Sequence, residues 1–306
     1  MPEGDSLVRL AHRLRPVMLD QTIERSDFRV PQLATVDLSD WVVIDISPMA
    51  KYLLMTVAAP ENFTDRAHHL VVLSHLGMDG SWHIDTRPSY RTRCIFHFAE
   101  HAVVGDTLKL LEVHPVEQTE QQLAFLGPDL LDPAWEEPSK AEQLLARSLQ
   151  NFRQAADQPI GTALLDQRLV SGIGNIYRCE VLLLARINPH RVVSELTDEQ
   201  LIGLILLARD LMVINVPPRA AERTRRRTVD VREDPHATFG VRVATATEQA
   251  RSRADRGRSR RDPNFWVYGR ERQGCLRCGG PVRQEKLGTK PDNERDLHWC
   301  PNCQTG

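Results

Sequence analysis

The chain has 306 residues, of which 41% are hydrophobic and 26% charged, so it has the composition of a globular protein and enough length for two domains. No run reaches the roughly 18 consecutive apolar residues of a membrane-spanning helix, and residues 1–5 lack the basic and apolar stretches of a signal peptide. These features exclude a membrane partner, and we expect a cytoplasmic location.

The first part of the chain contains one predicted helix and then several predicted strands. The apolar residues of the helix recur at helical spacing, at Leu7, Leu10, Ala11 and Leu14, and Asp5 or Ser6 can cap its start. Runs rich in β-branched and aromatic residues follow between turn residues, at 41–46, 51–57, 69–74, 93–98 and 107–113. This pattern predicts a sheet-based domain.

The middle of the chain has a different pattern. Helical periodicity at 139–152, 176–186 and 197–214 predicts a helical module over residues 138–216. Residues 217–263 are rich in arginine and punctuated by proline, which predicts a long flexible loop. Fifteen arginines stand against eight acidic residues between Pro217 and Arg272, although the whole chain has a net charge of −2. This local charge fits a polyanionic partner, but a solvated loop explains it equally well.

Four of the six cysteines form two C-x-x-C pairs in the compact unit predicted at 264–306, namely Cys275 with Cys278 and Cys300 with Cys303. In a chain without an export signal, such pairs indicate a metal site rather than disulfides. Four thiolates complete the tetrahedral shell of one Zn²⁺ and leave no position for a catalytic water, so we predict a structural zinc ion. Free or redox-active thiols are the alternative.

Two further motifs carry little weight alone. Gly172 and Gly174 precede a predicted helix whose first N–H groups, with the side chain of Asn175, can bind a phosphate; a plain helix–helix connection explains the same glycines. Once Met1 is removed, Pro2 has a secondary amine, and α-amino groups have a pKa of about 8. A neutral amine of this kind can attack an aldehyde-level carbon. Read in isolation, this is also an ordinary beginning for a protein.

These signals occur together, in this order, in one family. The chain resembles the formamidopyrimidine-DNA glycosylase/endonuclease VIII family, and its Met-Pro-Glu-Gly-Asp start is closer to the endonuclease VIII branch. Members begin with Pro-Glu, carry a helix–two-turn–helix module with a Gly-x-Gly-Asn-x-Tyr turn, and end in a four-cysteine zinc hairpin. Further matching segments are Ala50-Lys51-Tyr52-Leu53, His75-Leu76-Gly77-Met78, Leu126-Gly127-Pro128, Asn188-Pro189 and Trp266-Val-Tyr-Gly-Arg270.

The resemblance implies a mixed α/β fold with damaged DNA as the partner, and we expect the protein to be a monomer. Its parts are a β-sandwich-like catalytic domain at 1–130, a helix–two-turn–helix DNA-binding domain at 138–216 and a zinc hairpin at 264–306. The implied activity is excision of oxidised bases, pyrimidines preferred, followed by β,δ-elimination at the abasic site. Neither a catalytic metal nor a nucleotide cofactor is implied.

The resemblance also implies a role for individual residues. Pro2 would be the nucleophile at C1′ of the damaged nucleotide, Glu3 the general acid/base, and Lys51 a helper in proton transfer and phosphate binding. Met78 would fill the space that the extruded base leaves. The phosphates around that nucleotide would be held by Asn175 and Arg295.

Two departures from the family pattern, at Ser6 and in the missing wedge segment, give weight to a second interpretation, a catalytically weak paralogue that only binds damaged or single-stranded DNA. Ser6 stands where the family usually has a second glutamate, and Gly161 or Thr162 stands where a lysine is common. An Arg-Arg-Phe-Gly segment, which supplies further wedge residues in the formamidopyrimidine branch, is missing from residues 113–122. Retention of the three implied catalytic residues favours the enzyme.

Overall fold

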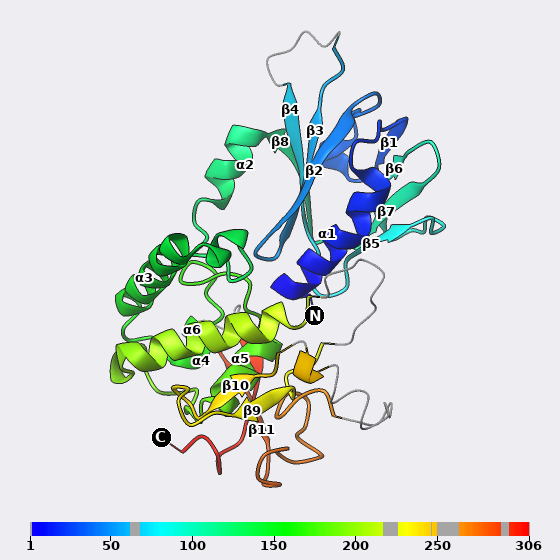
Figure 1. Cartoon of the computed structure of the whole chain (residues 1–306). Helices are drawn as coiled ribbons and strands as arrows, with labels where there is room; N and C mark the ends of the chain where they lie inside the picture. The colour runs from blue at the N-terminus through cyan, green and yellow to red at the C-terminus, as the bar shows by residue number, and fades with distance from the viewer. Residues whose placement is uncertain are drawn as a thin grey trace. The chain divides into compact units, whose positions relative to one another are not determined.

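The computed structural model consists of two compact units, the first ending at Phe125 and the second beginning at Leu126 (Figure 1). Strands dominate the first unit and helices the second, which confirms the predicted mixed α/β class. No helix within the described residues is long and apolar enough to cross a membrane. The structure describes residues 2–61, 68–216, 226–245, 247–249, 263–288 and 294–305.

The first unit contains two four-stranded antiparallel sheets that share one hydrophobic core. The first sheet has the order β2-β3-β4-β8, with β2 (Val42–Met49), β3 (Tyr52–Ala58), β4 (His69–His75) and β8 (Leu110–Pro115). The second has the order β1-β6-β7-β5, with β1 (Arg25–Phe28), β6 (Thr92–His97), β7 (Ala102–Asp106) and β5 (Ser81–Ile84). Alternate residues of β3 point into the core, as a strand period of two requires. The predicted β-sandwich-like domain is confirmed.

Two helices and a short 3-10 turn complete the first unit. The helix α1 (Gly4–Met18) buries the four apolar residues that predicted it and packs against β2. The helix α2 (Val116–Leu123), which was not predicted from the sequence, follows β8 directly. The 3-10 turn η1 (Pro31–Leu33) follows β1.

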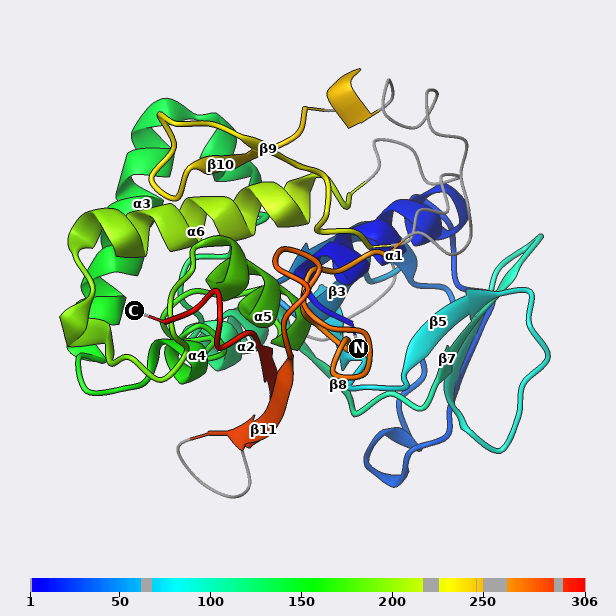
Figure 2. The same ribbon diagram turned by 90° about the horizontal axis from the view of Figure 1, so that it is seen from below.

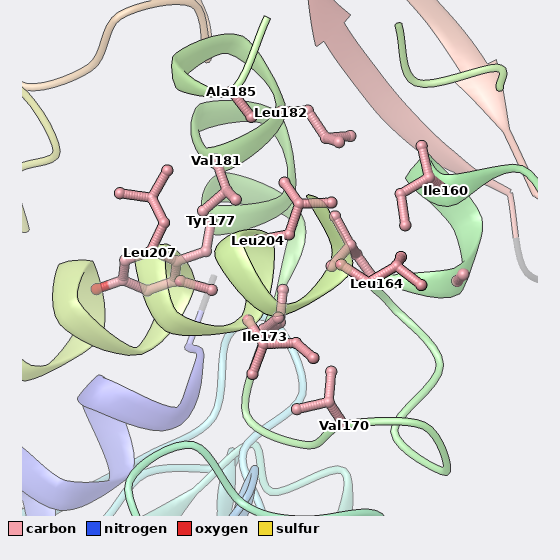
Figure 3. Packing of buried hydrophobic residues seen from close by; sticks show 14 of the residues in the cluster. Ile160, Leu164, Val170, Ile173, Tyr177, Val181, Leu182, Ala185, Leu204 and Leu207 are labelled. Atoms are coloured by element: carbon pink, nitrogen blue, oxygen red, sulfur yellow. The ribbon is translucent and has the colours of Figure 1, made fainter. Parts of the chain in front are cut away.

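The second unit is built around a bundle of helices. They are η2 (Pro133–Glu136), α3 (Pro138–Gln154), α4 (Ile160–Ala163), α5 (Asn175–Leu184), η3 (Val193–Glu195) and α6 (Asp198–Val213). Tyr177 and Val181 of α5 pack against Leu204 and Leu207 of α6 in the centre of this core (Figure 3). The three predicted helices of the module are confirmed, and each of their ends lies within two residues of the predicted position.

The predicted flexible loop at 217–263 contains regular secondary structure in its middle. Two short antiparallel strands, β9 (Val231–Glu233) and β10 (Val241–Val243), form a ribbon beside α6 (Figure 2). Their valines and Phe239 pack against the helical core, which gives the ribbon a reason to form. A three-residue strand is too short for its alternation to be recognised in a sequence. Residues 217–225, 246 and 250–262 lie outside the described residues.

The cysteine-rich end of the chain forms an antiparallel hairpin of β11 (Arg283–Leu287) and β12 (Arg295–Trp299). Its small core combines Val267, Val282 and Leu297 with Cys179 and Leu183 of α5. Because α5 contributes to both this core and the helical core, it joins the hairpin to the bundle within the second unit.

Candidate functional site

The start of α1 holds two buried carboxylates. Glu3 is the N-cap residue, has an extended backbone and is completely buried. Its backbone N–H donates to Ser6 Oγ at 3.4 Å, and its carbonyl oxygen accepts from Ser6 N at 2.8 Å. Asp5, equally buried, forms an ion pair with Arg9 at 2.9 Å. Ser6, which stands where the family usually has a glutamate, therefore caps the helix and fixes Glu3 next to Pro2.

The helix α1 runs antiparallel to β2. Arg15 Nε donates to the carbonyl oxygen of Ile46 at 2.9 Å, and the N–H of Asp20 donates to the carbonyl oxygen of Val43 at 2.8 Å. Arg15 of the helix thus meets Ile46, and Asp20, two residues beyond the end of α1, meets the earlier strand residue Val43. The first residues of α1 and the last residues of β2 therefore lie at the same end of the first unit.

Lys51 lies in the tight turn that follows β2 and precedes β3. From the contact between Arg15 and Ile46, the backbone runs about 18 Å along α1 to Glu3 and about 16 Å along β2 to Lys51. These nearly equal distances place both residues at the same end of the first unit. Figure 1 shows the start of α1 and the turn between β2 and β3 at this end. The structure brings the predicted Pro2, Glu3 and Lys51 together at this end.

Met78 lies in the turn between β4 and β5, and 72% of its surface is exposed. His75 Nδ1 accepts a hydrogen bond from the N–H of Gly77 at 2.9 Å, and Gly77 has a φ of 66° that favours glycine. A Cβ atom on Gly80 would lie 2.3 Å from the carbonyl oxygen of Leu76. The turn is therefore tightly specified, and it presents an apolar side chain to solvent.

The imidazole of His75 is neutral near pH 7. Burial, together with the positive charges of Lys109 and Lys51, lowers the pKa of His75 to about 4. A neutral ring leaves Nδ1 free to accept the hydrogen bond from Gly77, which a protonated ring would not do. The ring also packs edge-on against Tyr52, its partner in the register of β3 and β4. His75 thus links the turn that holds Lys51 to the turn that holds Met78.

The glycine-rich turn before α5 has the expected shape. Gly172 has a φ of 98°, and its N–H donates to Gln167 Oε1 at 3.0 Å. Gly174 is the N-cap of α5 in an extended conformation, so the helix begins at Asn175. The first N–H groups of a helix have no acceptor within it and point outward from its start. The start of α5 thus has the form of a helix terminus at which anions bind in many proteins, with Asn175 as its first residue.

The side chains of Asn175 and Arg178 connect α5 to the hairpin. The carbonyl oxygen of Asp296 accepts hydrogen bonds from Asn175 Nδ2 at 2.6 Å and from Arg178 Nη2 at 2.9 Å. Arg178 Nη2 also donates to Asn175 Oδ1. Asp296 follows the exposed Arg295 at the start of β12. Both predicted phosphate-binding residues therefore lie on neighbouring elements of the second unit.

Of the two residues that stand where the resemblance implies a lysine, Gly161 is closely packed against its neighbours. A Cβ atom on Gly161 would lie 2.8 Å from Leu287 Cδ2 and 3.0 Å from the carbonyl oxygen of Pro189. The carbonyl oxygen of Gly161 accepts a hydrogen bond from Arg178 Nη1 at 3.3 Å. Arg178 was not predicted as a site residue, although charged residues inside a mostly apolar helix were the available signal.

The four paired cysteines meet at one point beside the hairpin, and their sulfur atoms all lie within 4.8 Å of one another. The Sγ atoms of Cys275 and Cys303 are 4.0 Å apart, and those of Cys278 and Cys300 are 3.5 Å apart. Tetrahedral coordination with metal–sulfur bonds of about 2.3 Å puts ligand sulfurs about 3.8 Å apart. The cysteines therefore fit a tetrahedral ion with four thiolate ligands, as predicted.

Comparison with known proteins gives matches over nearly the whole chain. Residues 1–113 match the formamidopyrimidine-DNA glycosylase N-terminal domain, and residues 131–218 match the formamidopyrimidine-DNA glycosylase H2TH domain. The chain is 34% identical to a probable endonuclease 8 2 of Streptomyces coelicolor, over 100% of this chain and 95% of that protein. It is 32% identical to the DNA-(apurinic or apyrimidinic site) lyase Nei2 of Mycolicibacterium smegmatis, over 100% of this chain and 99% of that protein.

A similar fold occurs in a solved structure. The formamidopyrimidine-DNA glycosylase of Lactococcus lactis, bound non-covalently to DNA with an abasic site, superimposes with a TM-score of 0.69 at 18% identity. The match covers 100% of both chains.

Proposed function

Because the chain belongs to the formamidopyrimidine-DNA glycosylase family, on its endonuclease VIII branch, we propose that it excises oxidised bases from DNA and then cuts the abasic site. The observation that carries this proposal is the placement of Pro2, Glu3 and Lys51 at one end of the first unit. A secondary amine, a buried carboxylate and an ammonium group supply a nucleophile, a proton carrier and a phosphate ligand.

In the proposed reaction, the amine of Pro2, freed by removal of Met1, attacks C1′ of the damaged nucleotide. The bond from C1′ to the base breaks, and the base departs with a proton. Glu3 protonates the ring oxygen of the sugar, which opens and leaves an iminium between Pro2 and C1′. Loss of a proton from C2′ then expels the 3′ phosphate, and a second elimination expels the 5′ phosphate. Hydrolysis of the iminium regenerates the amine.

The second unit holds the DNA backbone in this proposal. Asn175 gives one of its two amide N–H groups to Asp296 and retains the other for a phosphate oxygen. Arg295 is exposed and adds a charge-assisted contact. The exposure of Met78 supports the role of a void filler, since a side chain that enters the base stack must be available at the surface.

The metal of the cysteine cluster is, in this proposal, one structural Zn²⁺ ion. The four thiolates Cys275, Cys278, Cys300 and Cys303 would hold it and so fix the hairpin that carries Arg295. The ion would supply folding energy and no chemistry of the reaction. A monomeric state and a cytoplasmic location remain expectations.

We further propose that ring-saturated pyrimidines are preferred over 8-oxoguanine opposite cytosine. Met78 is the single wedge that can be assigned, and damaged bases that stack poorly cost least to extrude. An excision assay that compares thymine glycol, dihydrouracil and 8-oxoguanine, in single- and double-stranded oligonucleotides, tests this. The fastest turnover on 8-oxoguanine opposite cytosine would overturn the preference. Binding of all substrates without excision would favour the non-catalytic paralogue.

A further inference from the structure

Arg178 is completely buried on α5, where an unsatisfied guanidinium group would be strongly destabilising. Its Nη2 donates to Asn175 Oδ1 and to the carbonyl oxygen of Asp296 at 2.9 Å. Its Nη1 donates to the carbonyl oxygen of Gly161 at 3.3 Å. The planar fork of an arginine can serve three acceptors in this way, whereas a lysine offers a single nitrogen.

This network decides which way the Asn175 amide points. With Oδ1 held by Arg178, the NH₂ group faces Asp296 and donates to its carbonyl oxygen at 2.6 Å. If the amide turned by 180°, its NH₂ group would face the guanidinium donors, and its oxygen would face the carbonyl oxygen of Asp296. Both contacts would be repulsive, so the turned orientation is excluded.

We propose that Arg178 is a positioning residue that orients Asn175 for phosphate binding. The inference rests on the proposed function, because it concerns the phosphate contact assigned to Asn175. Without Arg178 the amide loses the partner of its oxygen, and its second N–H group no longer has a fixed direction toward a phosphate. The guanidinium itself is completely buried and acts through Asn175.

The test measures the Kd for a duplex that contains a tetrahydrofuran abasic analogue, with the full-length, metal-loaded protein at several salt concentrations. Asn175→Ala and Arg178→Met should each weaken binding about tenfold, the effect of one lost hydrogen bond to a charged group. The double variant should also weaken binding about tenfold, because the second change removes nothing further. Since neither residue brings a charge to the DNA, the slope of log Kd against log salt should not change in these variants.

Arg153→Met is the matched control. The guanidinium of Arg153 also donates to backbone carbonyl oxygens of the second unit, those of Leu196 at 2.8 Å and Val193 at 3.3 Å. These contacts do not involve Asn175, so this variant should bind the duplex like the wild type. If Arg178→Met does not fold, Arg178→Lys takes its place in the double-variant comparison.

Three outcomes would overturn the positioning role. One is a hundredfold loss in the double variant, which would mean independent effects; another is unchanged binding in the Arg178 variant. The third is a reduction of the salt slope by about one, which would mean that Arg178 contacts a phosphate directly. The proposed function fails separately, if the wild type neither binds nor cuts abasic DNA.

Discussion

Glu180 Oε1 accepts a hydrogen bond from the backbone N–H of Val267 at 2.9 Å, although the two residues are 87 positions apart. The same carboxylate accepts from the N–H groups of Trp266 at 2.7 Å and Tyr268 at 2.8 Å, and from the hydroxyl group of Thr228. Three successive backbone donors thus converge on one completely buried carboxylate of α5. Burial raises the pKa of Glu180, and these hydrogen bonds act in the opposite direction. Glu180 therefore anchors the segment that leads into the cysteine unit.

Replacement of Glu180 by glutamine should destabilise the second unit by about 3 kcal/mol. The NH₂ group of the glutamine would face buried backbone N–H groups that need an acceptor. Urea unfolding followed by tryptophan fluorescence measures this loss. Glu142→Gln, the same exchange at an exposed position of α3, is the control and should unfold like the wild type. Equal midpoints for both variants would show that the carboxylate is not the anchor.

The first unit should lose stability as the pH falls from 6.5 toward 4, in part through His75. The pKa of His75 is about 4 in the folded chain and near 6.5 when unfolded, so the unfolded state binds more protons in this window. The contribution of His75 to the free energy of unfolding is complete above pH 6.5 and is lost as the pH falls from 6.5 to about 4. Thermal unfolding of wild type and His75→Gln at several pH values tests this. An unchanged pH dependence in His75→Gln would contradict it.

Met78→Ala should lower excision from duplex DNA about tenfold or more while leaving the free energy of unfolding within about 0.5 kcal/mol of the wild type. The side chain is 72% exposed and adds little to the core, so any loss must arise in the complex with DNA. Activity on single-stranded DNA should change less, because no stacked duplex has to be opened. Met49→Ala, also at an exposed methionine, is the control. Equal losses on both substrates would argue against the wedge.

Cys300→Ser should release the metal and unfold the hairpin of β11 and β12, because closed thiolate sites contribute directly to folding. Elemental analysis should find one zinc ion per chain in the wild type and none in the variant, and binding of abasic DNA should fall. Cys94→Ser, in the buried core of the first unit, should keep its zinc. Full DNA binding without metal would contradict the proposed role of the site.

Much of the fold was predictable because its signals are local. The helix of Leu7 and Leu14, the main strands and the three long helices of the second unit each show a periodicity that the structure confirms. The cysteine cluster was predictable for a similar reason, since a C-x-x-C pair places both sulfurs on one turn. The ribbon of β9 and β10 was not, because its stability comes from packing on distant helices.

The residues that support the site, Arg178 and Glu180, could not be predicted from the sequence for the same physical reason. Arg178 and Glu180 bond to segments more than 80 positions away, and no local pattern shows which backbone atoms will meet them. The hydrogen bond from Glu3 N to Ser6 could not be predicted either, since a serine near a helix start can act as the N-cap itself or bond to another backbone group. What the sequence does show is that charged residues interrupt an apolar helix, which is a signal for buried partners.

The central claim, that Pro2 is the nucleophile, is tested by trapping the protein on an abasic-site oligonucleotide with borohydride, followed by mass spectrometry of the crosslinked peptide. The adduct should map to the N-terminal peptide with Met1 absent, and a chain extended by one residue before Pro2 should form no adduct, because its proline nitrogen is an amide. With only five lysines in the chain, an alternative Schiff base is easily located. An adduct on a lysine such as Lys51, or undiminished trapping by the extended chain, would contradict the account.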